Sequence, residues 1–362
     1  MRTDSDIPGP LRKIMAGVLS ISGFKSWFSG FHPARPALLL ILCLFGPAAD
    51  CIPAENPEPV TVTLHWQHQS QFAGYYMALA KGFYAQEGLD VQIMRGGPDV
   101  RVGEMLRSGK TDFASFMLSS ALEERAAGLS MVQLAQVVNR SNFLLVAWKD
   151  AAEGVSIKEL SDLNGRNITV WLQDFRAPYL ALFASKKVHP VILPQYYTLS
   201  LFLHRGAMAC SVMRYNEYHT LRQYGIQDKD VQIFSLHDLG IRLPEDGIYC
   251  LDETWKQRPE TCRKFVRATL KGWTYARDHE KETLDEVMKY VRKENLPVNR
   301  MHMSWMLREI LASIFPAKGD DWVFGRIPRK TYEGASGMLI RYGGLRTAPP
   351  FEDFVKEEAL HD

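Results

Sequence analysis

The sequence predicts an α/β protein of two lobes, each built on its own sheet, with a ligand cleft between them. A strand–helix–strand unit over residues 60–93 is the first observation. Short apolar runs that alternate with helical patterns, in two groups between which the chain crosses twice, are the second. A mostly helical part from Pro259 onward is the third. Alternation of this kind is typical of sheets flanked by helices.

The opening unit begins with apolar residues at every second position over 60–66, the period of a strand. Apolar and aromatic residues then recur at helical spacing over 72–83. Ser70 is a suitable N-cap for that helix, and Gly82 suits the left-handed position beyond its end. A second strand begins at Leu89. The length of the connection predicts a parallel crossover.

Domain boundaries follow from the two expected crossings. We read the apolar strand ending at Trp148 as the crossing into the second lobe, and the turn near 247 as the return. The first lobe is therefore expected over 58–148 and 247–345, the second over 149–246, and a C-terminal tail over 346–362. The C-terminal helices should pack mainly on the first lobe.

Composition limits the classes of function. The chain has 362 residues, 46% hydrophobic and 23% charged, which is ordinary for a globular protein with room for two domains. A net charge of +2 without a basic run argues against nucleic acid as a partner. The five cysteines form no Cys-x-x-Cys pair and no histidine lies at ligand spacing, so no metal site is expected. The disulfide state of Cys210, Cys250 and Cys262 stays open.

Residues 1–57 predict a secretory signal peptide and a linker. Basic residues precede a nine-residue apolar run at 37–45, which is far shorter than the ~20 residues of a membrane span. We expect cleavage between residues 45 and 55 and export to the periplasm or another extracytoplasmic space, with Met15 as an alternative start. Cys51 suggests a lipoprotein anchor, but Asp50 lies at a position where lipoprotein signals need a small residue. The alternative is an N-terminal extension with a chance apolar patch.

Candidate ligand residues lie where strands end. Trp66 and the amides that follow it, Gln71 among them, come at the carboxyl end of the first strand, where open α/β sheets bind ligands. Trp171 holds the equivalent position in the second lobe. A Trp face with nearby amides suits a flat, nitrogen-rich small molecule, and Phe72 could extend the aromatic wall. Core packing is the alternative for all three aromatic residues.

Two further groups are candidates for polar contacts. Ser119 and Ser120 open a helix, where free backbone N–H groups could hold a polar ligand group or the serines could simply cap the helix. Asn216 and Glu217 follow the strand-like run 211–215. A carboxylate accepts hydrogen bonds only, so Glu217 would pair with an exocyclic amino group or a protonated ring nitrogen.

The chain resembles the thiamine-pyrimidine-precursor family of periplasmic-binding-protein-like folds. Three groups of residues carry the resemblance. The first, over 66–91, is a Trp-ended strand followed by Ala-Gly, Lys-Gly-aromatic-Tyr and Glu-Gly-Leu-Asp-Val. The other two are Asn216, Glu217 and Tyr218, and Lys271, Gly272 and Trp273. The resemblance covers about residues 58–345 and implies a two-lobed type II fold. It also implies that Glu217 contacts an aminopyrimidine.

The resemblance implies a substrate-binding protein of an ABC importer, monomeric and without a cofactor, that delivers a formylated or hydroxymethyl aminopyrimidine to a membrane permease. Fungal members that are enzymes consume one of their own histidines and carry a cysteine cluster. This chain has Ser120 at the aligned position and no such cluster, so we expect no catalysis. It also has Ala209 and Cys210 at the positions where relatives commonly have Asp-Ala. The alternatives are a fungal-type pyrimidine synthase, a sensor with a separate partner, or a binder of riboflavin, another heterocycle or a sulfonate.

Overall fold

The computed structural model describes residues 56–150, 156–171, 175–315, 317 and 322–361. The expected signal peptide, Met15 and Cys51 lie outside these residues. Residues 53–362 form one compact unit, to which the following description applies. Among the described residues, no helix combines the length and the apolar character needed to cross a membrane.

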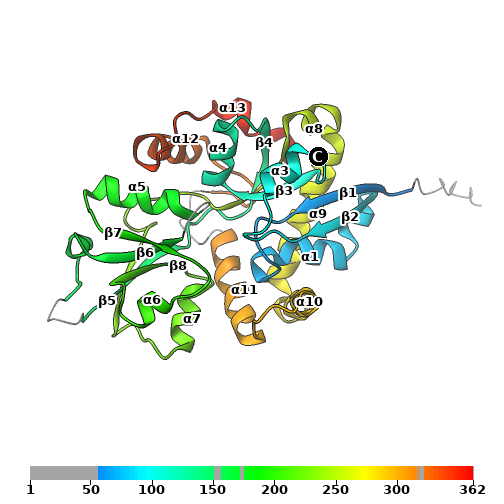
Figure 1. The fold of residues 1–362 in the computed structure, drawn as a ribbon. Helices are drawn as coiled ribbons and strands as arrows, with labels where there is room; N and C mark the ends of the chain where they lie inside the picture. Colours follow the sequence, from blue (N-terminus) through cyan, green and yellow to red (C-terminus); the bar gives the residue numbers. More distant parts are fainter. Residues whose placement is uncertain (1–55, 151–155, 172–174, 316, 318–321, 362) are drawn as a thin grey trace, which may run out of the picture. The chain divides into compact units, whose positions relative to one another are not determined.

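The first sheet contains five strands in the order β2-β1-β3-β10-β4 (Figure 1). Its bounds are β1 Glu58–Thr63, β2 Leu89–Met94, β3 Phe113–Met117, β4 Met131–Gln136 and β10 Asp246–Leu251. The predicted crossover is confirmed, because β1 pairs in parallel with β2 through helices α1 Ala73–Ala80 and α2 Phe83–Gln86. The returning strand β10 is antiparallel to both β3 and β4.

The capping prediction for Ser70 is wrong. Ser70 begins a short 3-10 helix, η1 Ser70–Phe72, and its hydroxyl donates to the carbonyl of Met303 and accepts no capping N–H from η1 or α1. Gly82 does adopt the predicted left-handed conformation, with φ of 68°. The remote hydrogen bond explains the error, because sequence spacing reveals only local cap partners.

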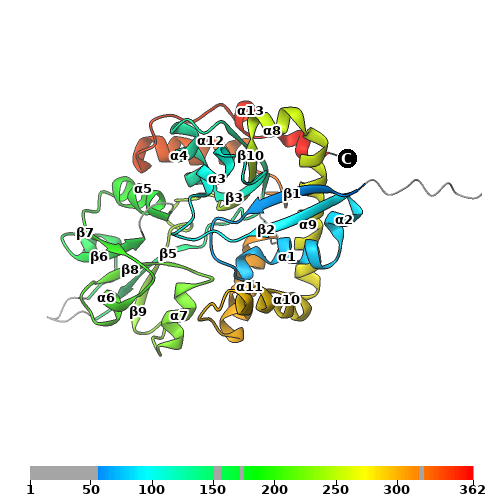
Figure 2. The ribbon, with the colours of Figure 1, turned by 45° about the vertical axis from the view of Figure 1, so that its right-hand side comes forward.

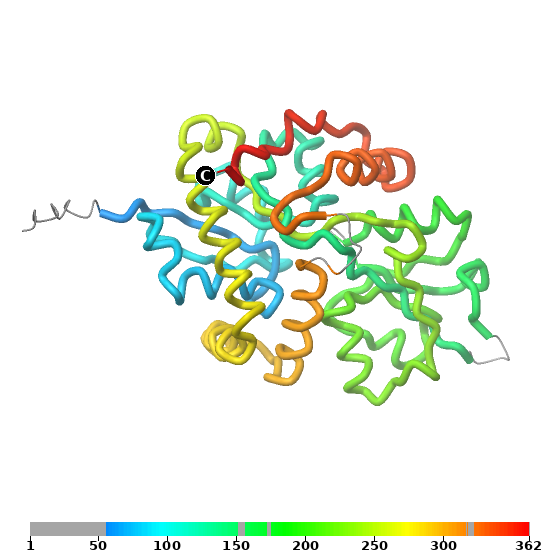
Figure 3. The backbone as a smooth tube through the Cα atoms, turned by 180° about the vertical axis from the view of Figure 1, so that it is seen from behind, coloured from blue at the N-terminus to red at the C-terminus, as the bar shows by residue number. Residues whose placement is uncertain are grey.

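Helix α1 packs against the long helix α9 Pro259–Asp278 through glycines on both sides. A Cβ at Gly272 would lie 2.1 Å from the carbonyl oxygen of Gly74, and a Cβ at Gly74 would lie 2.2 Å from the ring of Trp273. Figure 3 shows the yellow α9 beside the blue segment that carries α1. Two of the phrases that carry the family resemblance therefore meet in one packing contact.

The second sheet also has five strands, in the order β7-β6-β8-β5-β9 (Figure 2). Its bounds are β5 Phe143–Trp148, β6 Asn167–Trp171, β7 Val191–Gln195, β8 Ala209–Met213 and β9 Val231–Ser235. Three helices accompany it: α5 Arg176–Lys186, α6 Ser200–Leu203 and α7 Glu217–Gln223. Strands β6, β7 and β8 are parallel, whereas β5 runs antiparallel between β8 and β9.

The membership of β5 corrects the expected boundary near Trp148. The sequence predicts 143–148 as part of the first lobe, but β5 pairs with β8 and β9, so the chain crosses over residues 137–142. The return crossing, expected near 247, spans 236–245 and precedes β10. All six residues of β5 are buried, as are those of β4. A continuous apolar run identifies a buried strand but not the sheet to which it belongs.

The two crossings are held together by buried polar groups. Both the backbone N–H and the side-chain amide of Asn142 donate to the carboxyl group of Glu245. The hydroxyl of Ser313 donates to Asn142 Oδ1 at 2.9 Å. Glu245 is fully buried. Asn142, Glu245 and Ser313 thus satisfy one another within the chain, as burial of polar groups favours.

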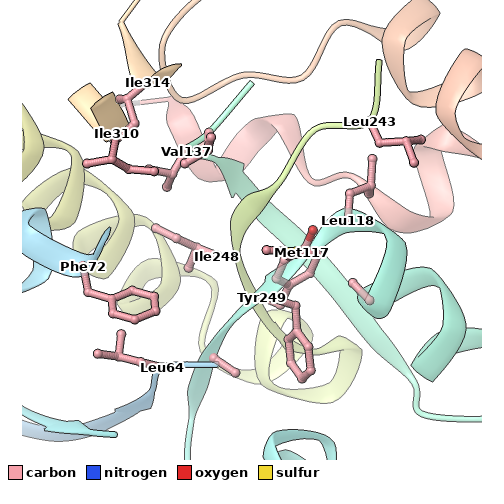
Figure 4. Packing of buried hydrophobic residues seen from close by; sticks show 14 of the residues in the cluster. Leu64, Phe72, Met117, Leu118, Val137, Leu243, Ile248, Tyr249, Ile310 and Ile314 are labelled. Atoms are coloured by element: carbon pink, nitrogen blue, oxygen red, sulfur yellow. The ribbon is translucent and has the colours of Figure 1, made fainter. Parts of the chain in front are cut away.

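The remaining elements of the first part cover its sheet. They are helices α3 Val102–Arg107, α4 Leu118–Ala126, α8 Asp252–Gln257, α10 Glu280–Lys293 and α11 Arg300–Ile314. Figure 4 shows Ile248 and Tyr249 of β10 among buried side chains that include Phe72, Met117 and Ile310. Cys210, Cys250 and Cys262 are buried and unbridged.

The expected C-terminal tail over 346–362 packs on the rest of the structure in its described residues. Helix α12 Arg329–Met338 leads into a π-helical turn, η5 Leu339–Gly343, which packs against α5 of the second sheet. The final elements are α13 Phe351–Phe354 and the 3-10 turn η6 Glu357–Leu360. Val355 bridges to Gln133 of β4, and Lys356 N donates to the carbonyl of Gln133. Residues 351–360 are therefore part of the folded structure.

Candidate functional site

Two cavities lie where loops from the two sheets face each other. The first has a volume of about 450 Å³ and contains Asn216, Glu217 and His302 in its wall. The second has a volume of about 550 Å³ and is lined by His65, Phe116 and Phe175, among others. Trp66, Trp171 and Tyr197 line both. These three rings form a partition that divides the space between the sheets.

The partition is an aromatic cluster with nearly perpendicular rings. The ring of Trp66 lies 5.9 Å from that of Trp171 and 5.5 Å from that of Phe175, both at 89°. Tyr197 meets Trp66 at 6.1 Å. Such edge-to-face pairs are a favoured arrangement for aromatic side chains. Trp66 and Trp171 are both half-buried. Their exposed surface is therefore available to a flat ligand in either cavity.

The backbone near Trp171 is fixed by Ser211 of the neighbouring strand. Trp171 is the last residue of β6, and its N–H donates to Ser211 Oγ at 2.9 Å. Trp66 lies beyond the end of β1, in the loop that leads to η1. The strand-end positions that the sequence predicts therefore bring both indoles to the same cavity wall.

Glu217 is the first residue of α7, and its carboxyl group folds back toward the strand that precedes it. One oxygen accepts from the N–H of Met213 at 2.8 Å, and the other accepts from Asn216 Nδ2 at 2.9 Å. Burial raises the pKa of Glu217 to about 7, although both hydrogen bonds act to lower it. Each carboxylate oxygen keeps an unused lone pair. Glu217 can therefore accept hydrogen bonds from a ligand in the first cavity.

Asn216 is held by a histidine from a distant helix. His302 Nε2 lies 2.9 Å from Asn216 Oδ1. The other nitrogen of that ring, Nδ1, lies 2.9 Å from Nδ1 of His219. His219 in turn stacks on Trp305 at 4.9 Å with an angle of 11° between the rings. A hydrogen-bonded array thus runs from Glu217 through Asn216 to two histidines.

Behind the second cavity lies a buried polar network. The N–H and Nδ1 of His65 both lie 2.9 Å from Ser115 Oγ. Gln71 Nε2 donates to Asp246 Oδ2 at 2.9 Å and lies 3.1 Å from His65 Nε2. Burial lowers the pKa of His65 to about 3 and raises that of Asp246 to about 7. The network links the cavity wall to β10 at the return crossing.

The candidate residues from the sequence fall into two groups. Trp66, Trp171, Asn216 and Glu217 line the first cavity together. The side chains of Gln71, Phe72, Ser119 and Tyr218 are buried and line neither cavity.

Each residue of the second group lies away from the cavity walls for its own physical reason. Phe72 packs edge-on against His65 within the core, at 5.2 Å. The ring of Tyr218 packs in the second part's own core, and its hydroxyl donates to the exposed Asp228 at 2.5 Å. Gln71 is engaged in the network behind the cavity wall. Ser119 is in the first turn of α4 and is 3% exposed.

Sequence reasoning missed His302 and Tyr197 as cavity residues. His302 is 86 residues from Asn216 along the chain, and nothing local to either residue indicates the contact. Tyr197 follows β7, and the rule that ligands meet strand ends could have found it. Among the described residues, no group of three or more His, Cys, Asp or Glu side chains is arranged to hold a metal ion.

Two sheets joined by two crossings, with cavities between them, define a periplasmic-binding-protein fold. Solved structures agree. The periplasmic sulfonate-binding protein SsuA from Methylobacillus flagellatus matches with a TM-score of 0.62 at 16% identity, over 84% of this chain and 93% of that one. The ligand-binding component of an ABC-type import system from Staphylococcus aureus matches with a TM-score of 0.60 at 13% identity, over 84% and 98%.

The chain belongs to the NMT1/THI5-like family, whose model matches residues 69–283. The riboflavin-binding protein RibY of Chloroflexus aurantiacus is 27% identical over 69% of this chain and 72% of its own length. The formylaminopyrimidine-binding protein of Halalkalibacterium halodurans is 23% identical over 72% and 78%. A 4-amino-5-hydroxymethyl-2-methylpyrimidine phosphate synthase of Saccharomyces cerevisiae is also 23% identical, over 61% and 67%. The predicted fold class and family are confirmed.

Proposed function

We propose that this protein is the extracytoplasmic substrate-binding component of an ABC importer and that it binds a thiamine-related aminopyrimidine. The observation that carries the proposal is the carboxyl group of Glu217, which shares a cavity wall with the half-buried Trp66 and Trp171. A formylaminopyrimidine or hydroxymethylpyrimidine presents amino hydrogens to an acceptor and a π-face to an indole. The formylaminopyrimidine-binding relative supports this ligand class.

The charge of the site suits such a ligand. Glu217 is an acceptor at both oxygens, and the two protein donors that hold it occupy one position on each. A ligand amino group would supply the further donors, and a charge-assisted hydrogen bond contributes roughly 1.5–3 kcal/mol. Base stacking on an aromatic side chain contributes ~1–3 kcal/mol more. Together these interactions provide both affinity and discrimination.

Transport and location complete the proposal. Residues 1–57 direct export, and the two sheet-bearing parts act as lobes that close on the ligand by hinge motion. The closed monomer then presents the ligand to a membrane permease. We assign no catalytic step to the chain, since Ser120 stands where the fungal enzymes of the resemblance carry their consumed histidine.

Riboflavin is a second candidate, and a specific observation favours it. The two cavities meet at a shared aromatic wall and together offer about twice the volume of either one. A tricyclic ligand with a polar side chain could extend past the partition, whereas a single pyrimidine would occupy one cavity. The relative named for riboflavin binding supports this ligand.

Mass spectrometry of the small molecule that co-purifies with the mature protein tests the proposal. We expect an aminopyrimidine released on denaturation, in about one molar equivalent. Recovery of riboflavin would replace the first candidate with the second. Conversion of pyridoxal phosphate to a pyrimidine product by the purified protein with iron would overturn the assignment to transport.

A further inference from the structure

Helix α11 contributes a histidine to the wall of the first cavity, beside the start of α7. His302 is 6% exposed, lines the first cavity and reaches Asn216, the neighbour of Glu217. We propose that His302 is a positioning residue: through Asn216 it fixes Glu217 as an acceptor and so determines the preference for ligands that carry an amino group. This inference rests on the proposed function and deepens it.

The hydrogen bonds of Asn216 fix the orientation of its amide. Asn216 Nδ2 donates to Glu217 Oε1 at 2.9 Å, so Oδ1 of the same amide must face the other way. It faces His302 Nε2 at 2.9 Å. An amide oxygen accepts only, so Nε2 carries the proton and donates. If the amide rotated, its oxygen would meet the carboxylate oxygen and its NH₂ group would meet the imidazole donor.

The two ring nitrogens of His302 fix its tautomer. A neutral imidazole that donates from Nε2 must accept at Nδ1. The partner there is His219 Nδ1 at 2.9 Å, which therefore donates. Burial, reinforced by the charge of His219, lowers the pKa of His302 to about 4, which keeps the ring neutral. His219 is held in place by its stacking on Trp305, whose indole N–H donates to the carbonyl of Arg214.

His302 is itself anchored through the first turn of α11. Asn299 caps α11, and its side-chain oxygen accepts the backbone N–H of His302 at 2.8 Å. The next residue, Met303, accepts from Ser70 Oγ at 2.7 Å, which ties the same turn to η1. The histidine is thus fixed by η1, close to the first sheet, while Asn216 follows a strand of the second. The hydrogen bond between them couples Glu217 to both parts.

These contacts have a consequence for specificity. With His302 present, Glu217 offers acceptor oxygens, and a ligand without an amino hydrogen leaves them unpaired. Without His302, the Asn216 amide can rotate, and Glu217 then loses a hydrogen bond that helps to lower its pKa, so the protonated form, which can donate, becomes more populated. Loss of His302 should therefore lower the affinity for a ligand with an amino group and leave the affinity for a ligand without one nearly unchanged. The discrimination between the two ligands then falls.

Calorimetric titration with two probes tests the inference. The probes are 4-amino-5-hydroxymethyl-2-methylpyrimidine and the analogue in which hydrogen replaces the 4-amino group. The wild type should prefer the amino probe. In His302→Phe, which keeps ring volume but lacks both nitrogens, that preference should fall about tenfold, with little change for the probe without the amino group. His302→Gln, which keeps a donor for Asn216, should retain much of the preference.

Control variants separate positioning from folding. His279→Phe changes an exposed histidine that stacks on Tyr275, outside both cavities, and should leave the preference unchanged. Equal weakening of both probes in His302→Phe, or an undiminished preference, would overturn the inference. A wild type that binds neither probe would instead refute the proposed ligand class, so the two failures are distinguishable.

Discussion

The carboxyl group of Glu217 is held by local partners, whereas a histidine from a distant helix holds the Asn216 beside it. The strand-like run before it predicts a place at a strand end, and the structure puts it at the start of α7, directly after β8. Its partners are a backbone N–H four residues earlier and the adjacent Asn216, both local. The histidines behind Asn216 come from tertiary contacts, which no local pattern reveals.

The tryptophans were predictable for the same reason. Each lies at or just beyond the end of a strand whose pattern is visible in the sequence, and the strand ends meet at the cavity. Phe72 and Tyr218 lie in the core and not in a cavity wall, because aromatic residues at helical spacing pack in a core as readily as they line a site. Pattern alone cannot say which face of a short helix is buried when nearly all of its faces are, as in α1.

Replacement of Trp66 by alanine should weaken aminopyrimidine binding about 10-fold or more. The indole supplies the stacking face, worth ~1–3 kcal/mol. Titration calorimetry measures the loss, and a thermal melt of the same sample reports any change in folding. Trp255→Ala removes a half-buried indole that lines neither cavity and serves as the control. Unchanged binding by Trp66→Ala would remove the partition from the site.

At the scale of elements, the contact between α1 and α9 gives a physical reason for two of the family phrases. The backbones of Gly74 and Gly272 approach so closely that neither position has room for a methyl group. Trp273 then fills the space beside Gly74 and is 1% exposed. These glycines and the tryptophan position the opening helix on the first sheet, so part of the resemblance reflects packing rather than ligand contact.

The variant Gly272→Ala should lower the free energy of unfolding by at least 1–3 kcal/mol, the usual cost of about one overpacked methylene. The added Cβ would meet backbone atoms of α1, which cannot move without displacing the helix. Urea denaturation monitored by circular dichroism measures the change. Gly334→Ala in α12 is the matched control, because no atom lies within 4 Å of its Cβ position. It should be neutral or slightly stabilising. Equal stability of the two variants would contradict the packing account.

The assignment of β5 shows what element patterns leave open. The alternation of apolar runs with helical patterns predicts a two-lobed α/β fold correctly. The sheet to which β5 belongs depends on its pairing with β8 and β9. Pairing partners are set by long-range contacts, and a run buried on both faces carries no sign of them. Similarly, the short elements after 346 are too brief to produce a periodic signal, although Val355 and Lys356 contact β4.

Across the whole molecule, three buried carboxyl groups lie at the site and at the return crossing. Burial raises the pKa of Glu217 and Asp246 to about 7 and that of Glu245 to about 8. Each group binds its proton more tightly in the folded state than in the unfolded state. Their contribution to stability is therefore complete at acid pH and is lost as the pH rises through these values.

Buried histidines act in the opposite direction at lower pH. Burial lowers the pKa of His65 to about 3 and those of His68 and His302 to about 4. Their contribution is present above their ordinary pKa of 6.5 and is lost as the pH falls toward these values. The two effects oppose each other below about pH 6.5. Above that pH only the carboxyl groups still make the free energy of unfolding depend on pH.

The free energy of unfolding should therefore fall between about pH 6.5 and 8.5. Urea denaturation at a series of pH values measures the slope. Glu245→Gln cannot ionise and should show a shallower decline, even though its altered hydrogen bonds to Asn142 reduce stability at every pH. A stability that is constant or that rises over this range would contradict the burial of these groups.

The central claim is that an aminopyrimidine binds between the sheets through the carboxylate of Glu217. Calorimetric titration at pH 8, where Glu217 is mostly ionised, tests it with 4-amino-5-hydroxymethyl-2-methylpyrimidine and its formylamino counterpart. Glu217→Gln replaces an acceptor by an NH₂ group that faces the ligand's donors, so affinity should fall by ~10- to 100-fold. Glu253→Gln, at an exposed position of α8, should bind like the wild type. Equal affinity of Glu217→Gln and the wild type would contradict the assigned site, and a wild type that binds neither compound would contradict the ligand class.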